Sequence, residues 1–217
     1  MKQVCGAQPR PVHERGLQQS GFTRGAGGFS LLELLVVLAL MFILTTMYWS
    51  GGAASRQHKL LSECRANLQM IHMAMEIYAN EHAGRFPEAT NARTSGEALA
   101  ELVPRYTVDT VVFICPGSND RALPAGEPFL NRKISYAYYM GRRTANAENV
   151  LMSDAQTDTR SKLAGEYIFS STGKPPGNNH GKYGGNFLFC DGHAESCPAQ
   201  ARFSIMLTDG VVLLNPK

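Results

Sequence analysis

The hydrophobic pattern divides the chain into an apolar segment, an amphipathic segment and a longer mixed part. Residues 29–49 form 21 consecutive positions with a single charged side chain, Glu33. A helix of this length extends roughly 31 Å at about 1.5 Å per residue, which is enough to cross the hydrocarbon core of a bilayer. A carboxylate inside such a segment is costly in lipid, so Glu33 marks a functional position.

The amphipathic segment that follows has apolar residues at alternating spacings of three and four, which predicts a helix with one buried stripe. The stripe is formed by Leu61, Cys64, Leu68, Ile71, Met75 and Tyr78. Residues 50–52 (Ser-Gly-Gly) are a point where the helix can bend, and Gly84 with Pro87 predicts its end. A continuous helix over residues 29–82 would be roughly 80 Å long. We expect the C-terminal domain to pack on the stripe.

Residues 84–217 are long enough for one globular domain. Residues 95–103 predict a short helix, and runs of β-branched and aromatic residues predict strands at 107–114, 134–140, 149–153 and 166–170. A hairpin is predicted over residues 186–197 with Asp191-Gly192 as a two-residue type I′ turn, and a second pairs 203–207 with 211–214 around Asp209-Gly210. The domain is therefore a mostly antiparallel sheet, and together with the long helix it gives an α+β fold.

Charge and cysteine usage indicate where the parts of the chain lie. The net charge is +3, and residues 1–28 account for all of it with four basic and one acidic side chain. A basic segment before the apolar run predicts a cytoplasmic N-terminus and a domain on the far side of the membrane. The remaining side chains sum to zero, which gives no support to nucleic-acid binding.

Four of the five cysteines lie in this expected extracytoplasmic part, where disulfides can form. Across a regular hairpin Asn186 faces Cys197, so Cys190 and Cys197 would lie roughly 13 Å apart, beyond the about 7 Å that a disulfide allows. Cys64 on the stripe and Cys115 at a strand end are then the favoured pair, although the sequence alone leaves three connectivities open.

Residues 28–37, Gly-Phe-Ser-Leu-Leu-Glu-Leu-Leu-Val-Val, resemble the processing site of type IV pilins and type II secretion pseudopilins. A signal peptide or a simple anchor fits less well, because neither accounts for Glu33. The resemblance implies that prepilin peptidase cleaves between Gly28 and Phe29 and that Phe29 becomes N-methylated. Glu33 would then be the fifth mature residue. It lies four positions beyond the new cationic amine, so it can pair with it in the same helix or in a neighbouring subunit.

The resemblance also implies four parts, a pilin-like fold and a set of partners. The parts are a cleaved leader (residues 1–28), a transmembrane and assembly helix (29–50), an amphipathic stem (51–83) and a sheet domain (84–217). The partners would be prepilin peptidase, other pilin or pseudopilin subunits and an inner-membrane assembly platform, with no nucleic acid expected. The protein would be a non-enzymatic filament subunit, single-pass in the inner membrane, with its domain in the periplasm.

The C-terminal part offers candidate chemistry that this function does not need. Residues 180–193, which run from His180 to Asp191-Gly192-His193, resemble a hairpin motif of pilin-like proteins, with one extra residue before Asp-Gly. Asp154, His180, Asp191 and His193 are candidate metal ligands, and related major pseudopilins bind calcium in a C-terminal loop. Ser170 or Ser171 with His180 and Asp191 form a weaker candidate triad. The alternative function is a membrane-anchored extracytoplasmic binding domain or metal-dependent hydrolytic domain that uses a pilin-like leader.

Overall fold

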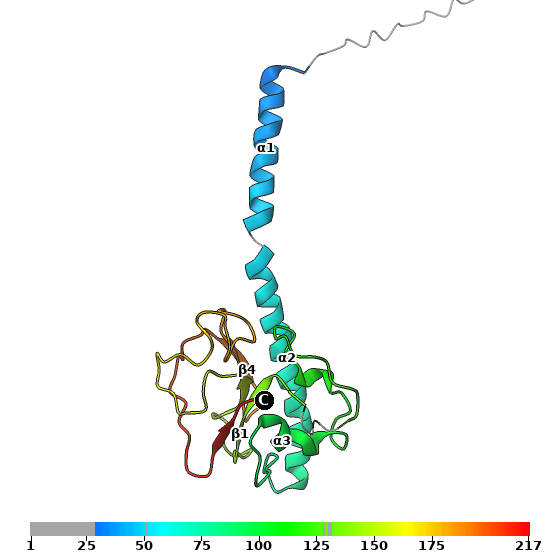
Figure 1. Ribbon diagram of the computed structural model, residues 1–217, viewed down its shortest axis with the longest axis vertical. Coiled ribbons are helices and arrows are strands. Elements are labelled where there is room, and N and C mark those ends of the chain that lie inside the picture. The colour runs from blue at the N-terminus through cyan, green and yellow to red at the C-terminus, as the bar shows by residue number, and fades with distance from the viewer. Residues whose placement is uncertain (1–28, 51, 128, 130–131) are drawn as a thin grey trace, which may run out of the picture. The chain divides into compact units, whose positions relative to one another are not determined.

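The computed structural model describes residues 29–217 except residues 51, 128 and 130–131 (Figure 1). It separates into two compact units, one ending at Met47 and one running from Tyr48 to Lys217. The leader, Gly28 and Gly51 lie outside the described residues. We describe the two units separately.

The first unit contains α1 (Leu31–Ser50) as far as Met47, and apolar side chains lie on all sides of this part of the helix. Residues Leu31–Tyr48 have a mean hydropathy of 2.3 and are long and apolar enough to cross a membrane. The hydroxyl of Thr45 donates to the carbonyl oxygen of Met41 at 2.9 Å, so it does not present an unpaired polar group to an apolar surrounding. Among residues 29–47, the part of this unit that the structure describes, none of the large apolar side chains is buried.

The second unit contains α2 (Gly52–Glu81), the predicted stem. All six residues of the predicted stripe, from Leu61 to Tyr78, are buried, which confirms that the domain packs on this face. The helix ends where the sequence predicts. Gly84 adopts a positive φ of 75°, and its N–H donates to the carbonyl oxygen of Ala79 at 2.8 Å. A short helix α3 (Ser95–Leu99) and the 3-10 turn η1 (Ala100–Leu102) then occupy most of the predicted helical stretch 95–103.

The described strands form one antiparallel sheet in the order β4-β3-β2-β1-β5. Their bounds are β1 (Tyr136–Met140), β2 (Val150–Asp154), β3 (Gly185–Phe189), β4 (Ala194–Cys197) and β5 (Val212–Leu214). The sheet and the helices confirm the expected α+β class. The predicted strands at 134–140 and 149–153 correspond to β1 and β2.

Alternation along the strands separates two apolar cores on the two faces of the sheet. Tyr136 and Tyr138 of β1 join the α2 stripe in one core, whereas Ala137 and Tyr139 belong to the other. The second core is closed by loop residues such as Phe169 and Ile205. The tyrosine-rich strand therefore serves packing.

Residues 107–114 are not a strand, which corrects the prediction. They contain the 3-10 turn η2 (Val111–Phe113). The Thr110 hydroxyl donates to the carbonyl oxygen of Pro124 at 2.8 Å, and Asp109 Oδ1 accepts the Val111 N–H at 3.1 Å. These local side-chain bonds compete with strand pairing and override the β-branched composition. The predicted strand at 166–170 is reduced to a single bridge between Tyr167 and Gln200.

The first hairpin forms, but its register differs from the predicted one. Leu188 pairs with Ala194 and Gly185 with Cys197, and Phe189 N–H donates to His193 O at 2.9 Å. The loop thus has three residues, 190–192, and Gly192 takes the left-handed position with φ 86°. A three-residue loop is the usual alternative to the predicted type I′ turn, and a glycine in its last position satisfies it equally well.

The second predicted hairpin is wrong in its pairing. The turn at Asp209-Gly210 forms, with Val211 N–H donating to Thr208 O at 3.0 Å. However, β5 pairs with the edge of β1, and Ile205 bridges Lys162 instead of the chain that follows it. Pairing with the edge of β1 places Leu213 in one apolar core and Leu214 in the other. A separate hairpin would not bury the two side chains in this way.

Candidate functional site

The described part of the predicted processing segment lies at the start of α1. Phe29 is exposed, and Glu33 lies four positions later in the first turn of the helix, also exposed. The Ser30 hydroxyl accepts the N–H of Leu32 at 3.3 Å, close to the start of the helix. The described structure therefore presents both residues to solvent or to a partner.

A second candidate site is a buried cluster of Cys64, Cys115, Asp154 and His180. One ligand atom from each residue lies within 4.8 Å of the other three, and all four residues are fully buried. Four separate segments supply them: the stripe of α2, the turn after η2, the end of β2 and the loop before β3. The cluster therefore lies where the stem helix meets the sheet domain.

Three short contacts link the four residues. Cys64 Sγ lies 3.2 Å from Asp154 Oδ1, and Cys115 Sγ lies 3.2 Å from His180 Nε2. The same His180 nitrogen lies 3.4 Å from Asp154 Oδ2. Among the described residues, Cys64, Cys115, Cys190 and Cys197 are unbonded thiols.

Surrounding donors stabilise a negative charge on the Asp154 carboxylate. Asn179 Nδ2 donates to Oδ1 at 2.9 Å, and Asn186 donates to Oδ2 from its backbone N–H at 2.7 Å and from Nδ2 at 3.1 Å. The sulfurs have partners too, because Gly117 N–H donates to Cys115 Sγ at 3.4 Å and Tyr136 Oη lies 3.2 Å from Cys64 Sγ. Such a shell suits an anionic centre.

The pKa shifts in the cluster follow from burial and from these contacts. Burial alone would raise the pKa of Asp154, but hydrogen bonds from His180 and Asn179 lower it. Burial alone would lower the pKa of His180, yet its contacts with Asp154 and Cys115 raise it to about 10. Burial raises the pKa of Cys64 well above the usual thiol range. The core thus holds an ionised Asp154 facing His180.

The His180 ring is held in place by a close approach of the chain at Gly117. A Cβ atom at Gly117 would lie 2.5 Å from His180 Nδ1 and 2.6 Å from the carbonyl oxygen of Asn179. Position 117 therefore requires glycine for steric reasons. His180 Nδ1 itself is buried without a hydrogen-bond partner in the described chain.

Only part of the predicted metal set converges, which corrects the prediction. Asp154 and His180 come together, whereas Asp191 and His193 are exposed at the hairpin loop and pair with each other at 3.0 Å. The hairpin loop places these two side chains in solvent, because its turn lies beyond the ends of β3 and β4. Two residues predicted as a disulfide pair, Cys64 and Cys115, take their place in the cluster.

The predicted serine triad is not assembled. The Ser170 hydroxyl donates to the carbonyl oxygen of Lys174 at 2.7 Å, and Ser171 is exposed. His180 faces Cys115 and Asp154 instead, and Asp191 faces His193. The residues of the predicted triad therefore belong to three different local environments.

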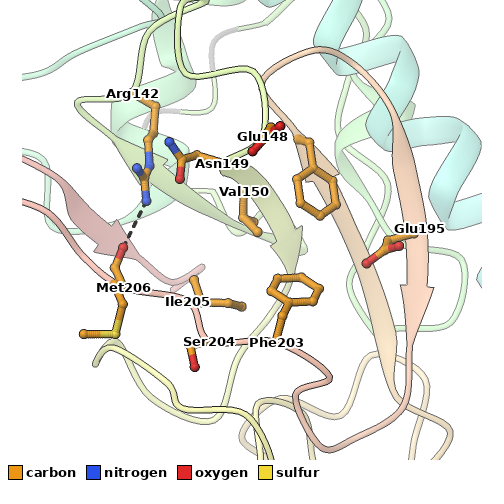
Figure 2. Close-up of a pocket in the computed structure, with 10 residues that line it drawn as sticks. Arg142, Glu148, Asn149, Val150, Glu195, Phe203, Ser204, Ile205 and Met206 are labelled. Atoms are coloured by element: carbon orange, nitrogen blue, oxygen red, sulfur yellow. Dashed lines mark hydrogen bonds between the residues drawn. The ribbon is translucent and has the colours of Figure 1, made fainter.

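A pocket of about 260 Å³ opens beside the other core of the sheet, as Figure 2 shows. Its apolar lining comes from Val150, Phe203 and Ile205 among others, and Arg142 Nη2 donates to the carbonyl oxygen of Met206 at 3.1 Å. Its lining residues include neither His nor Cys. The pocket and the buried cluster are therefore separate features of the domain.

Comparison with known proteins identifies a motif in the N-terminal segment. Residues 24–49 match the family model described as the prokaryotic N-terminal methylation motif. No curated protein and no solved structure matches the chain. The chain thus carries the type IV pilin-like prepilin signature, and the helix at this signature is long and apolar enough to cross a membrane.

Proposed function

We propose that this chain is a structural subunit of a filament of the type II secretion or type IV pilus type. Prepilin peptidase would cleave between Gly28 and Phe29 and methylate Phe29, removing residues 1–28. The observation that carries the proposal is the methylation motif at residues 24–49, immediately before and within a helix that is apolar on all sides. Residues 29–50 would hold the subunit in the inner membrane, and residues 51–83 and 84–217 would lie in the periplasm.

Glu33 has a role in this assembly that an anchor alone does not require. Cleavage leaves a cationic amine on Phe29, and a cation or a carboxylate in lipid is costly unless it is paired. We propose that Glu33 pairs with the Phe29 amine of a neighbouring subunit and so fixes the axial register of the filament.

The outer face of α2 supports packing between subunits. Met70, Met73 and Ile77 are about half exposed, at 49%, 53% and 51%, and their spacing of three and four places them on one side of the helix. The opposite side of α2 is fixed to the domain by the buried stripe. An apolar row of this kind is explained by a covering partner, which we take to be the helices of other subunits and, during assembly, the inner-membrane platform.

Substitution of Glu33 by alanine separates assembly from anchoring. We expect E33A to stay in the membrane fraction and to lose surface filaments in immunoelectron microscopy, because the register pair is gone. Thr46→Ala in the same helix is the matched control and should assemble. Wild-type filament numbers from E33A would contradict the assembly role.

A further inference from the structure

We propose that Cys64, Cys115, Asp154 and His180 form a closed site for one transition-metal ion, and that zinc is the ion this donor set fits. The site would lock α2 onto the sheet domain. All four residues lie in the unit Tyr48–Lys217, and the site does not depend on filament assembly.

The distances already approach those of a metal-bound set. Tetrahedral zinc with bonds of about 2.0–2.3 Å has neighbouring ligand atoms roughly 3.3–3.8 Å apart. The contacts at 3.2, 3.2 and 3.4 Å lie near that range, and every pair of ligand atoms lies within 4.8 Å. Small side-chain shifts would therefore suffice to surround an ion.

The contacts of His180 favour a metal ligand over a catalytic base. In a nucleophile–histidine–carboxylate triad the two partners bind different ring nitrogens. Here Cys115 Sγ and Asp154 Oδ2 both approach Nε2, whereas Nδ1 has no hydrogen-bond partner in the described chain. One nitrogen carries at most one proton and cannot satisfy both neighbours, but a metal ion would satisfy all three groups at once.

The choice of ion follows from the donor atoms. Two thiolate sulfurs, one imidazole nitrogen and one carboxylate oxygen match the ligands that zinc takes, whereas calcium takes six to eight oxygens. Binding would displace three protons to solvent, one from each thiol and one from Nε2 of His180. The three anionic ligands exceed the ion's charge by one. The donors from Gly117, Asn179 and Asn186 would stabilise this negative excess.

The site would have a structural role, because the protein fills every coordination position. All four ligands come from the protein and all are fully buried, so no position remains for water or substrate, as in structural zinc sites. Cys64 belongs to α2 and the other three ligands belong to the sheet domain. The ion would thus join residues separated by up to 116 positions, from 64 to 180, and stabilise the docking of the stem.

A Cys64–Cys115 disulfide is the competing state and must be distinguished. It would use both sulfurs and leave Asp154 and His180 buried without a shared partner. The N–H of Gly117 that points at Cys115 Sγ suits a thiolate better than a disulfide sulfur. For this reason we favour the metal-bound state.

The test uses the full chain, purified in detergent without a histidine tag and under reducing conditions. We expect about one zinc per chain by elemental analysis, and a metal edge spectrum with two sulfur ligands at about 2.3 Å. C115S should lower the bound zinc by at least about tenfold. Cys190→Ser is the matched control, because Cys190 is equally buried in the same core but lies outside the cluster.

Cobalt provides a second readout that does not depend on the folding of a variant. Cobalt loaded into the wild-type chain should give thiolate charge-transfer bands and the strong visible absorption of a tetrahedral site. The proposal is overturned by a folded wild-type chain without metal, by a Cys64–Cys115 peptide in a non-reduced map of the native protein, or by zinc retained in folded C115S.

Discussion

Nε2 of His180 lies 3.2 Å from Sγ of Cys115, although 65 positions separate the two residues in the sequence. The turn after η2 and the loop before β3 are thereby fixed to each other, and Gly117 permits the approach. Cys64 brings α2 to the same point through Asp154. A single buried cluster thus connects the stem helix to the sheet domain that a filament would display.

The exposed apolar row of Met70, Met73 and Ile77 on α2 should be needed for filament assembly and not for folding. M73K would place a charge in the middle of the Met70–Met73–Ile77 row, so we expect filaments to be lost while the urea midpoint changes little. Exposed substitutions usually cost less than about 0.5 kcal/mol. Filaments are counted by immunoelectron microscopy.

Leu163→Lys is the matched control for M73K, since Leu163 is 58% exposed and lies in a loop away from α2. It should assemble like the wild type. If M73K also assembles normally, the row on α2 is not a subunit contact.

Substitution of Asn186 should lower the stability of the protein by more than the loss of a single hydrogen bond. Its Nδ2 donates to the carbonyl oxygen of Leu61 on α2 and to Asp154, both at 3.1 Å, and its Oδ1 accepts from Ser196. Asn186→Ala would remove all three of these hydrogen bonds, two of them buried, and we expect a loss of about 2–4 kcal/mol in the free energy of unfolding. Urea denaturation in detergent measures it.

Ser196→Ala removes only one of the Asn186 contacts and serves as the control, with an expected loss of about 0.5–1.5 kcal/mol. Equal losses from the two variants would show that Asn186 does not link α2 to the sheet.

Asp158 should contribute to the stability of the protein in a pH-dependent way. Its pKa would be raised by burial, but hydrogen bonds from Arg160 and Lys162 lower it below the ordinary value of 3.8. Lys162 Nζ lies 2.7 Å from Asp158 Oδ2, and the lysine side chain is only 6% exposed. A lowered pKa in the folded state means that the stabilisation is present above about pH 4 and is lost as the pH falls further.

Asp158→Asn should therefore lower the free energy of unfolding by about 1–2 kcal/mol at pH 7, with a difference that shrinks toward pH 2. Arg160→Gln is the control, because the Arg160 side chain is 81% exposed and solvent screens its pair with Asp158, so we expect little change in stability. A loss for Asp158→Asn that is constant from pH 7 to pH 2 would contradict the ionic origin.

The elements that depend on periodicity were predictable from the sequence. The stripe from Leu61 to Tyr78 has a strong helical repeat, and its burial followed directly. The aromatic composition of residues 134–140 also predicts a strand, which the structure shows at Tyr136–Met140. The hairpin forms as predicted, but its register differs from the predicted one. The reason is that Asp-Gly fits a two-residue turn and the end of a three-residue loop equally well.

Residues that depend on long-range contacts were harder to predict. The strand expected at 107–114 is overridden by the bonds of Thr110 and Asp109, which a propensity argument does not include. For the site, the sequence predicts Asp154 and His180 as metal ligands and Cys64 and Cys115 as a neighbouring pair. It does not predict that the four residues form one cluster. The available signal was that Cys64 lies on the buried stripe and so had to face the sheet.

Sequencing the N-terminus of the native protein decides whether the chain is processed as a prepilin. We expect a mature chain that begins with N-methylated Phe29, with Glu33 as its fifth residue. A native chain that begins at Met1, or beyond Ser50, would contradict it.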